Sequence, residues 1–178
     1  MRIISGKYKR TNLITLEGES TRPTKDMIKE ALFDTLQIQS GELLLDLFAG
    51  SGAIGIETIS RGGKAEFNDL NREAVKIIEA NLDKIHEEAK VLNLNYDECL
   101  RMVRNQGFDY LFADPPYAFE EYENIFKLCG EYDVMNKNGI IILEVKADNN
   151  IKEEIENYKL FKDKKYGIAR LLYYRRSL

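Results

Sequence analysis

Short apolar runs alternate with amphipathic stretches along most of the chain. The apolar runs are predicted to form strands at 43–48, 64–70, 90–95, 109–114 and 139–145. Several are apolar throughout, as expected for strands of a sheet buried on both faces. Helices are predicted between them at 53–61, 72–88, 97–105 and 120–135. This alternation predicts a doubly wound, mostly parallel α/β sheet.

The two ends of the chain have a different pattern. Residues 2–16 are predicted to form two short strands around a basic turn, and 24–38 an amphipathic helix. The tail from residue 160 alternates around Tyr166-Gly167, which predicts a terminal hairpin and an antiparallel edge strand. The length of 178 residues suits one compact domain, with an N-terminal hairpin extension at 1–20 and a main body at 21–178.

Composition is that of a soluble globular protein, with 44% hydrophobic and 31% charged residues. No apolar run is long enough to span a membrane and the first residues lack a signal peptide, so we expect a cytoplasmic protein. Cys99 and Cys129 do not have the spacing of a zinc site. His86 is the only histidine and lies in a charged helical stretch, which argues against a metal site or a catalytic triad.

The net charge of −4 does not suggest a nucleic-acid-binding protein, but its distribution does. Residues 1–25 hold six Lys and Arg against two Glu, and residues 159–178 hold seven against Asp163. The body between them is acidic. If the two basic ends meet in the fold, they form a positive patch that could hold phosphates. The alternative is that both ends are simply solvated.

A glycine-rich loop follows the first predicted central strand and opens a helix. Gly50, Gly52 and Gly55 form a GxGxxG pattern, which lets a ligand approach the backbone at a helix N-terminus. Asp69 ends the next strand, at the spacing where an acid binds ribose hydroxyls. These features alone would also fit a nicotinamide cofactor.

Asp46, just before the glycines, separates the two cofactor classes. A carboxylate is unfavourable beside a pyrophosphate, but it suits the ammonium and sulfonium groups of S-adenosylmethionine. Asp97, at the end of the third strand, could accept a hydrogen bond from the adenine amino group. Helix capping is the alternative role for Asp69 and Asp97. The loop therefore favours S-adenosylmethionine.

The tetrapeptide Asp114-Pro115-Pro116-Tyr117 follows the fourth predicted strand. Two prolines could simply form a rigid turn there, but ligands of open α/β sheets bind at these strand ends, beside the glycine loop. An exocyclic amino nitrogen of a base is a poor nucleophile because its lone pair is delocalised into the ring. The Asp114 side chain and the Pro115 carbonyl could each accept one N–H bond and aim the lone pair at a methyl group. Tyr117 could stack on the base.

In these motifs and their order the chain closely resembles the RsmD family of 16S rRNA guanine-N2 methyltransferases, over nearly its whole length. The matching segments are RIISGKYKR (2–10), TRPTKD (21–26), EALFDTL (30–36), LDLFAGSGAIGIE (45–57), SRG (60–62), DPPY (114–117) and the basic tail with its YG. TRPT and EALF ahead of the glycine loop are specific to this family. DPPY alone is shared by several amino-group methyltransferases.

The resemblance implies a Rossmann-like S-adenosylmethionine-dependent methyltransferase fold, with a doubly wound, mostly parallel seven-stranded sheet, an antiparallel edge strand and a small N-terminal hairpin. It implies methylation of one guanine of 16S rRNA, guanine-966 in the usual ribosomal numbering, in assembled or nearly assembled small subunits. By motif position it assigns the cofactor to Asp46, Phe48, Ala49, Gly50, Ser51, Gly52, Asp69 and Asp97. It assigns the target base to Asp114, Pro115, Pro116 and Tyr117. Arg10, Arg22, Thr24 and Lys25 lie where the extension could meet RNA or close the site.

The chain departs from the family pattern in two places. Asn68-Asp69 stands where the family usually has Val-Glu, so the acid proposed for the ribose is the shorter Asp69. Asp26-Met27-Ile28 replaces the more frequent Asp-Arg-Val, which removes one expected arginine from the RNA-contact region.

Other functions stay open on the residues alone. A DNA adenine-N6 or protein glutamine methyltransferase would use the same DPPY chemistry, although the chain lacks a separate DNA-reading domain. A nicotinamide-dependent oxidoreductase is disfavoured by Asp46 and DPPY, and a non-catalytic ribosome-assembly factor by the intact tetrapeptide. Nothing in the sequence marks a subunit interface, so we expect a monomer.

Overall fold

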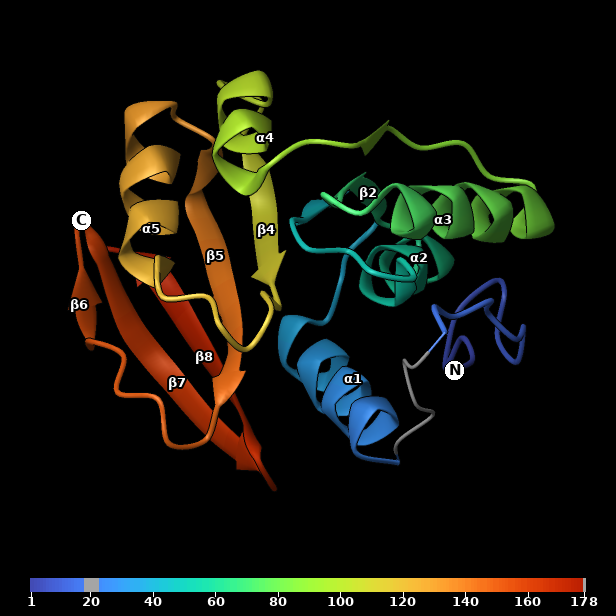
Figure 1. The fold of residues 1–178 in the computed structure, drawn as a ribbon, viewed down its shortest axis with the longest axis horizontal. Helices are drawn as coiled ribbons and strands as arrows, with labels where there is room; N and C mark the ends of the chain where they lie inside the picture. The colour runs from blue at the N-terminus through green and yellow to red at the C-terminus, as the bar shows by residue number, and fades with distance from the viewer. Residues whose placement is uncertain (18–22, 178) are drawn as a thin grey trace.

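The computed structural model describes residues 1–17 and 23–177, and of Pro23 and Thr24 the backbone only. Its centre is an eight-stranded sheet in the order β3-β2-β1-β4-β5-β8-β7-β6 (Figure 1). The strands are β1 (Leu43–Asp46), β2 (Lys64–Asn68), β3 (Val91–Leu92), β4 (Phe108–Ala113), β5 (Met135–Lys146), β6 (Glu154–Ile155), β7 (Tyr158–Tyr166) and β8 (Ala169–Arg176). The helices are α1 (Pro23–Leu36), α2 (Ala53–Ser60), α3 (Arg72–Ile85), α4 (Tyr96–Met102) and α5 (Tyr122–Glu131).

The sheet topology confirms the predicted doubly wound, mostly parallel arrangement. Strands β3, β2, β1, β4 and β5 are parallel, and β8 runs antiparallel to both β5 and β7. The chain order reverses between β1 and β4, which creates a switch point at their carboxyl ends. The predicted antiparallel pairing is found at one edge of the sheet, where β8, β7 and β6 pair in antiparallel fashion. One detail differs from the expectation, because the short β6 makes eight strands rather than seven.

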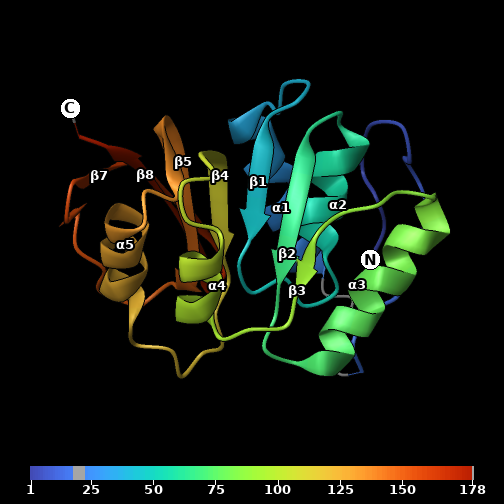
Figure 2. The ribbon, with the colours of Figure 1, turned by 90° about the horizontal axis from the view of Figure 1, so that it is seen from above.

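Both faces of the sheet are covered, which explains its continuous apolar strands. Successive residues of β1 point to opposite faces: Leu44 packs in the cluster beneath α1, and Leu45 in the cluster beneath α4 and α5. A further cluster, which includes Phe67 of β2, packs against α2 and α3. Figure 2 shows α4 and α5 on one side of the sheet and α1 and α2 on the other.

Several element boundaries differ from the sequence-based ones, each for a local backbone reason. Helix α3 ends at Ile85 because His86 adopts a left-handed conformation with φ 55°, and its N–H caps the helix. Helix α5 ends at Glu131, shortly before Asp133 at φ 47°, and β5 begins four residues earlier than predicted, at Met135. The third strand retains only the two residues of β3.

The N-terminal segment doubles back on itself as predicted, but without regular strands. A single antiparallel bridge joins Arg2 and Asn12, supported by backbone hydrogen bonds such as Ile3 N to Thr11 O at 2.9 Å. The segment is fixed by side chains of the core instead, because the buried Glu57 of α2 accepts the N–H groups of Ile4 and Ser5 at 2.8 and 2.9 Å. Of the helices described, none has the length and apolar character needed to cross a membrane.

Candidate active site

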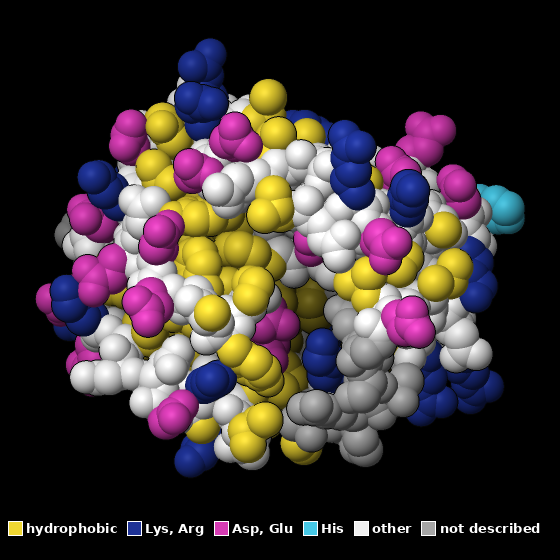
Figure 3. Space-filling view, in the orientation of Figure 1, with side chains coloured by type: hydrophobic (Ala, Val, Ile, Leu, Met, Phe, Trp, Pro, Cys, Tyr) yellow, Lys and Arg dark blue, Asp and Glu magenta, His cyan; other side chains and the backbone are white. Residues whose placement is uncertain are grey.

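A cavity of about 830 Å³ opens at the carboxyl ends of the central strands. It lies between the loops that follow β1, β2, β3 and β4, and the end of β5 forms one wall. Figure 3 shows this hollow, with apolar side chains on its floor and charged side chains inside it. Its volume is in the range of cavities that enclose a cofactor or a drug-sized ligand.

The glycine loop after β1 is held by two carboxylates. Asp46 is buried, and its Oδ2 accepts the N–H of Gly55 at 3.1 Å, in the first turn of α2. Asp69, at the end of β2, accepts the N–H of Gly50 through Oδ2 at 2.8 Å. Gly50 and Gly52 have φ of 55° and 78°, a backbone conformation that glycine adopts without strain. These bonds bring the loop backbone to the edge of the cavity.

The structure brings most of the predicted cofactor residues together. Phe48, Gly50 and Asp69 line the main cavity. An adjoining cavity of about 70 Å³ is lined by Asp46, Phe48, Ala49, Gly50 and Ser51. Gly52 forms the left-handed N-cap of α2, and it is not among the described residues that line either cavity.

Asp97 also lies outside the linings of both cavities, where its exposed side chain occupies the first turn of α4. The residue that does line the main cavity at this point is Asn95, the N-cap of α4, with Tyr96 beside it. Asn95 and Glu98 form a capping box. That pattern, an Asn followed three residues later by a Glu, was the signal in the sequence that would have placed the helix start and hence Asn95.

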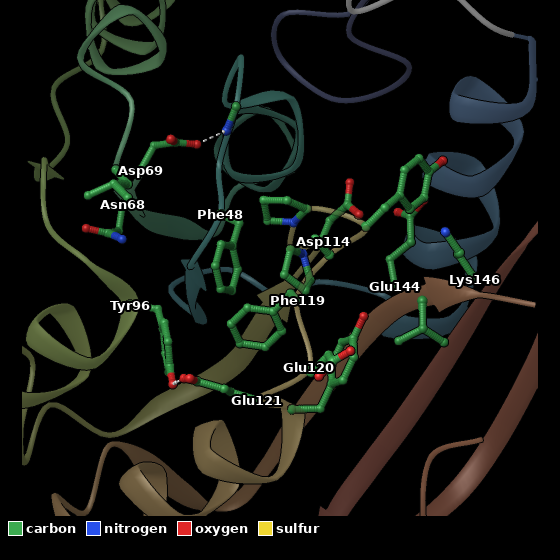
Figure 4. Close-up of a pocket in the computed structure, with 18 of the residues that line it drawn as sticks. Phe48, Asn68, Asp69, Tyr96, Asp114, Phe119, Glu120, Glu121, Glu144 and Lys146 are labelled. Carbon is green, nitrogen blue, oxygen red and sulfur yellow. Dashed lines mark hydrogen bonds between the residues drawn. The ribbon is translucent and has the colours of Figure 1, made fainter. Parts of the chain in front are cut away.

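Four aromatic rings form the floor of the cavity between the glycine loop and α5. Phe119 makes edge contacts with Phe48, Tyr96 and Tyr122, with ring centroids 5.2 to 5.4 Å apart. The hydroxyl of Tyr96 donates to Glu121 (Figure 4). Sequence reasoning missed Phe119 and Tyr96, because nothing in the local pattern distinguishes them from ordinary core aromatics.

All four residues of the predicted target-base motif line the main cavity. The turn Asp114-Pro115-Pro116-Tyr117 is closed by the N–H of Phe119, which donates to the carbonyl of Pro116 at 2.8 Å. Tyr117 is 68% exposed at the mouth. The ammonium of Lys146 lies 4.7 Å from the centre of its ring. This contact covers one face of the ring and leaves the rest of the side chain accessible.

Glu144 of β5 lines the same cavity and was not predicted (Figure 4). The pKa of its carboxyl group is raised to about 8, mainly by burial and further by the neighbouring carboxylate of Asp114, while the ammonium of Lys25 opposes the shift. The sequence contained one signal for this residue. Glu144 is the only charged residue within the apolar run 139–145. A charge in such a strand marks either a strand end or a functional group.

The charge inside the cavity is predominantly negative. The side chains of the described lining residues include five carboxylates and two lysines: Asp69, Asp114, Glu120, Glu121, Glu144, Lys25 and Lys146. Such an excess of carboxylates favours a cationic ligand over a pyrophosphate. In the described part of the chain, no group of three or more His, Cys, Asp or Glu side chains is arranged to hold a metal ion.

The predicted RNA-binding residues do not form one cluster. Lys25 lines both cavities from α1, whereas Arg10 is exposed on the N-terminal extension. Arg22 and the side chain of Thr24 lie outside the described residues. The two basic ends lie on opposite sides of α1 rather than forming a single patch (Figure 1). Each still reaches the cavity, through Leu16 near the extension and Ile168 at the tip of the β7–β8 hairpin.

The sheet order, the glycine loop and the adjoining DPPY turn together define a Rossmann-like methyltransferase. The family model described as Conserved hypothetical protein 95 matches residues 1–175, and the chain belongs to this family. The ribosomal RNA small subunit methyltransferase D of Haemophilus influenzae is 35% identical over 176 residues, which cover 95% of this chain and 90% of that protein. The putative rRNA methyltransferase YlbH of Bacillus subtilis is 32% identical, with 99% of both chains covered. These findings confirm the predicted family.

Solved structures agree with this assignment. The putative methyltransferase yhhF of Escherichia coli has a TM-score of 0.85 and 27% identity, and the match covers 99% of this chain and 98% of that one. The putative methylase HI0767 of Haemophilus influenzae has a TM-score of 0.82 and 31% identity, with the same coverage. A putative methyltransferase crystallised with S-adenosylhomocysteine shares the fold at 13% identity and a TM-score of 0.69.

Proposed function

We propose that this protein transfers a methyl group from S-adenosylmethionine to the exocyclic N2 of a guanine in 16S rRNA. The observation that carries the proposal is a single cavity that holds both the glycine loop with Asp69 and the Asp114–Tyr117 turn. One protein pocket thus presents cofactor-binding and amino-group-binding chemistry side by side. The rRNA substrate also agrees with the names of the relatives from Haemophilus influenzae and Bacillus subtilis.

The residues of the cavity fit S-adenosylmethionine. Its carboxylates suit the ammonium and sulfonium charges, and Asp69 can accept hydrogen bonds from ribose hydroxyls. The apolar Leu70 and the ring of Tyr96 line the wall where an adenine would lie. When bound, the cofactor supplies a methyl group made electrophilic by its sulfonium. We therefore assign its binding to Asp46, Phe48, Ala49, Gly50, Ser51 and Asp69, with Gly52 forming the turn from the loop into α2, and we replace Asp97 by Asn95.

The Asp114–Tyr117 turn holds the target amino group. The Asp114 carboxylate and the Pro115 carbonyl each accept one N–H, which orients the nitrogen lone pair toward the methyl group. The nitrogen would form its bond to the methyl carbon as the carbon–sulfur bond of the cofactor breaks, with the electron pair of that bond left on sulfur. The Asp114 carboxylate would favour the positive charge that develops on the nitrogen. The extra proton leaves the nitrogen through Asp114 to solvent at the mouth.

Tyr117 and the adjoining Lys146 act on the base once it has left its own stack. The exposed ring of Tyr117 offers a surface for stacking, a contact that contributes about 1–3 kcal/mol per base. Lys146 fixes the ring from one side through its cation–π contact. Lys25 and Arg10 belong to the proposed RNA-contacting surface, together with Arg22 and Thr24. We further propose that the protein acts as a monomer in the cytoplasm, on assembled or nearly assembled small subunits.

The decisive experiment is methyl transfer from labelled S-adenosylmethionine to small subunits isolated from cells that lack this activity, with naked 16S rRNA alongside. Nucleoside analysis should give N2-methylguanosine, mainly from the subunits. Label in another nucleoside would refute the substrate, and DNA and protein substrates assayed in parallel would identify a related amino-group methyltransferase. A protein that does not bind S-adenosylmethionine would refute the chemistry as a whole.

The variant Asp114→Asn tests the role of the turn. It keeps the size of the side chain but removes the negative charge, so transfer should fall at least about 100-fold while cofactor affinity stays within about twofold. Calorimetric titration and single-turnover rates measure the two quantities. Full transfer by Asp114→Asn would show that the carboxylate has no part in the step.

A further inference from the structure

Glu144 lies beside the target motif but has no part in the transfer step. Ala113 of β4 pairs with Leu143 of the parallel strand β5. Asp114, the first residue after β4, therefore lies beside Glu144, which is still within β5. Both line the main cavity and the smaller cavity next to it, and Figure 4 shows their side chains in the same part of the pocket.

Lys25 completes a set of three charged groups. It projects from α1 and lines the same two cavities. Glu144 interacts electrostatically with both of the other groups. The carboxylate of Asp114 disfavours the charged form of Glu144, and the ammonium of Lys25 favours it. Two hydrogen-bond acceptors and one cationic donor thus face the space that holds the target amino group.

Among the four RNA bases, one Watson–Crick edge matches this set. Guanine presents two neighbouring donors, the N2 amino group and N1–H, followed by the acceptor O6. Adenine places an unprotonated N1 next to its amino group, and cytosine places an unprotonated N3 there. Uracil has no exocyclic amino group. A carboxylate opposite N1 or N3 of these other bases would meet a lone pair instead of a hydrogen.

We propose that Glu144 and Lys25 read the target base as guanine: Glu144 accepts the N1–H, and Lys25 donates to O6. The inference rests on the proposed function, which assigns the N2 amino group to Asp114. It adds a specificity role for two residues outside the DPPY motif. A site built around such hydrogen bonds rejects an analogue that lacks the matching group, because its own polar groups are then left unpaired.

The test uses small subunits reconstituted on 16S rRNA in which the methylated guanine is replaced by 2-aminopurine. This base keeps the 2-amino group but lacks both N1–H and O6. At about pH 9, where the carboxyl group of Glu144 is largely ionised and can only accept, the unaltered enzyme should prefer guanine strongly. In Glu144→Gln the side-chain amide can donate to N1 of 2-aminopurine, so the preference for guanine should fall at least about tenfold.

Two further variants keep the test decisive. Glu131→Gln removes a carboxylate from an exposed residue at the end of α5 that lines neither cavity, so its preference for guanine should equal that of the unaltered enzyme. Lys25→Met should slow transfer to guanine about tenfold and leave transfer to 2-aminopurine unchanged, because that base has no O6. Cofactor binding, measured by calorimetry, verifies that each variant is folded.

The outcomes separate the two levels of the proposal. If the unaltered enzyme methylates guanine N2 but Glu144→Gln and Lys25→Met both keep its preference, the base-reading role is wrong and the proposed function stands. If the unaltered enzyme transfers no methyl group to guanine in subunits, the proposed function fails and this inference fails with it.

Discussion

The carboxyl group of Glu144 has a raised pKa of about 8, so it is largely protonated near neutral pH. Burial is the main cause, the Asp114 carboxylate adds to it, and the Lys25 ammonium opposes it. The charged form is the stronger acceptor for a guanine N1–H. We therefore expect kcat/KM to rise as the pH increases through about 8, as Glu144 loses its proton.

Initial rates between about pH 6 and pH 9 measure this rise. Glu144→Gln should remove it, because the amide does not titrate. Lys25→Met should move it to higher pH, because the ammonium that favours the charged carboxylate is gone. A pH profile that is the same for all three proteins would assign the ionisation to another group.

At the scale of elements, the N-terminal extension depends on one buried ion pair. Glu57 of α2 is fully buried and accepts the N–H groups of Ile4 and Ser5, while Lys29 of α1 lies 3.4 Å away and donates to the carbonyl of Arg2. Arg61 adds a second cation at 2.9 Å from Glu57. One carboxylate therefore joins the extension, α1 and α2.

Glu57→Gln should destabilise the protein by about 3–5 kcal/mol, because Lys29 would be left buried without its counter-charge. The extension should also loosen, so that trypsin cleaves the variant after Lys7, Lys9 or Arg10 faster than it cleaves the unaltered protein. Urea unfolding and limited proteolysis measure the two effects. Glu30→Gln, an exposed change on α1 next to Lys29, is the matched control and should leave both unchanged.

A second buried side chain connects the extension with the glycine loop. Asn81 of α3 is fully buried, accepts the N–H of Ile14 at 2.8 Å, and donates to the carbonyls of Ile14 and Ser51 at 2.9 and 3.0 Å. The position of Ser51 therefore depends on a residue thirty positions along the chain.

Asn81→Ala should lower the affinity for S-adenosylmethionine about tenfold and destabilise the fold by about 1–3 kcal/mol, because three buried bonds are lost. Lys84→Met provides the control, since Lys84 donates to the extension, at the carbonyl of Asn12, and has no hydrogen bond to the glycine loop among the described residues. Equal cofactor affinities for the two variants would mean that Asn81 holds the extension alone and has no effect on the loop.

The elements themselves were largely predictable from the sequence. Apolar runs located the five parallel strands to within a few residues, because a strand buried on both faces leaves a continuous apolar signal. Their ends were less predictable. Helix α3 ends earlier than predicted because the backbone at His86 is left-handed. The extension forms a single bridge instead of two strands because Glu57, distant in sequence, binds the backbone of its first arm.

At the scale of the whole molecule, the two basic segments lie on either side of α1 (Figure 1). The extension carries the exposed Arg10, and the β7–β8 hairpin carries the exposed Lys164 and Lys165 near its tip. Under the proposed function, phosphates of the RNA contact both segments.

Charge reversal at Arg10 or at Lys164 should therefore weaken RNA binding. The slope of the logarithm of the binding constant against the logarithm of the salt concentration should become shallower by about 0.7–0.9 for each phosphate contact that is lost. Cofactor affinity should not change. Filter binding over a range of salt concentrations gives the slope, and Lys127→Glu on the outer side of α5 is the control. Reversals that leave the slope unchanged would place the RNA elsewhere on the molecule.

The sequence by itself determined the fold class, the family, the glycine loop and the DPPY turn, because each depends on residues that are neighbours in the chain. Only the tertiary structure decided which other side chains share their cavity. Strand register brought Glu144 beside Asp114, helix packing brought Lys25 to both, and the true cap of α4 put Asn95 at the wall in place of Asp97. Contacts between residues far apart in the chain leave no local pattern, so the proposed base recognition could be inferred only from the assembled sheet.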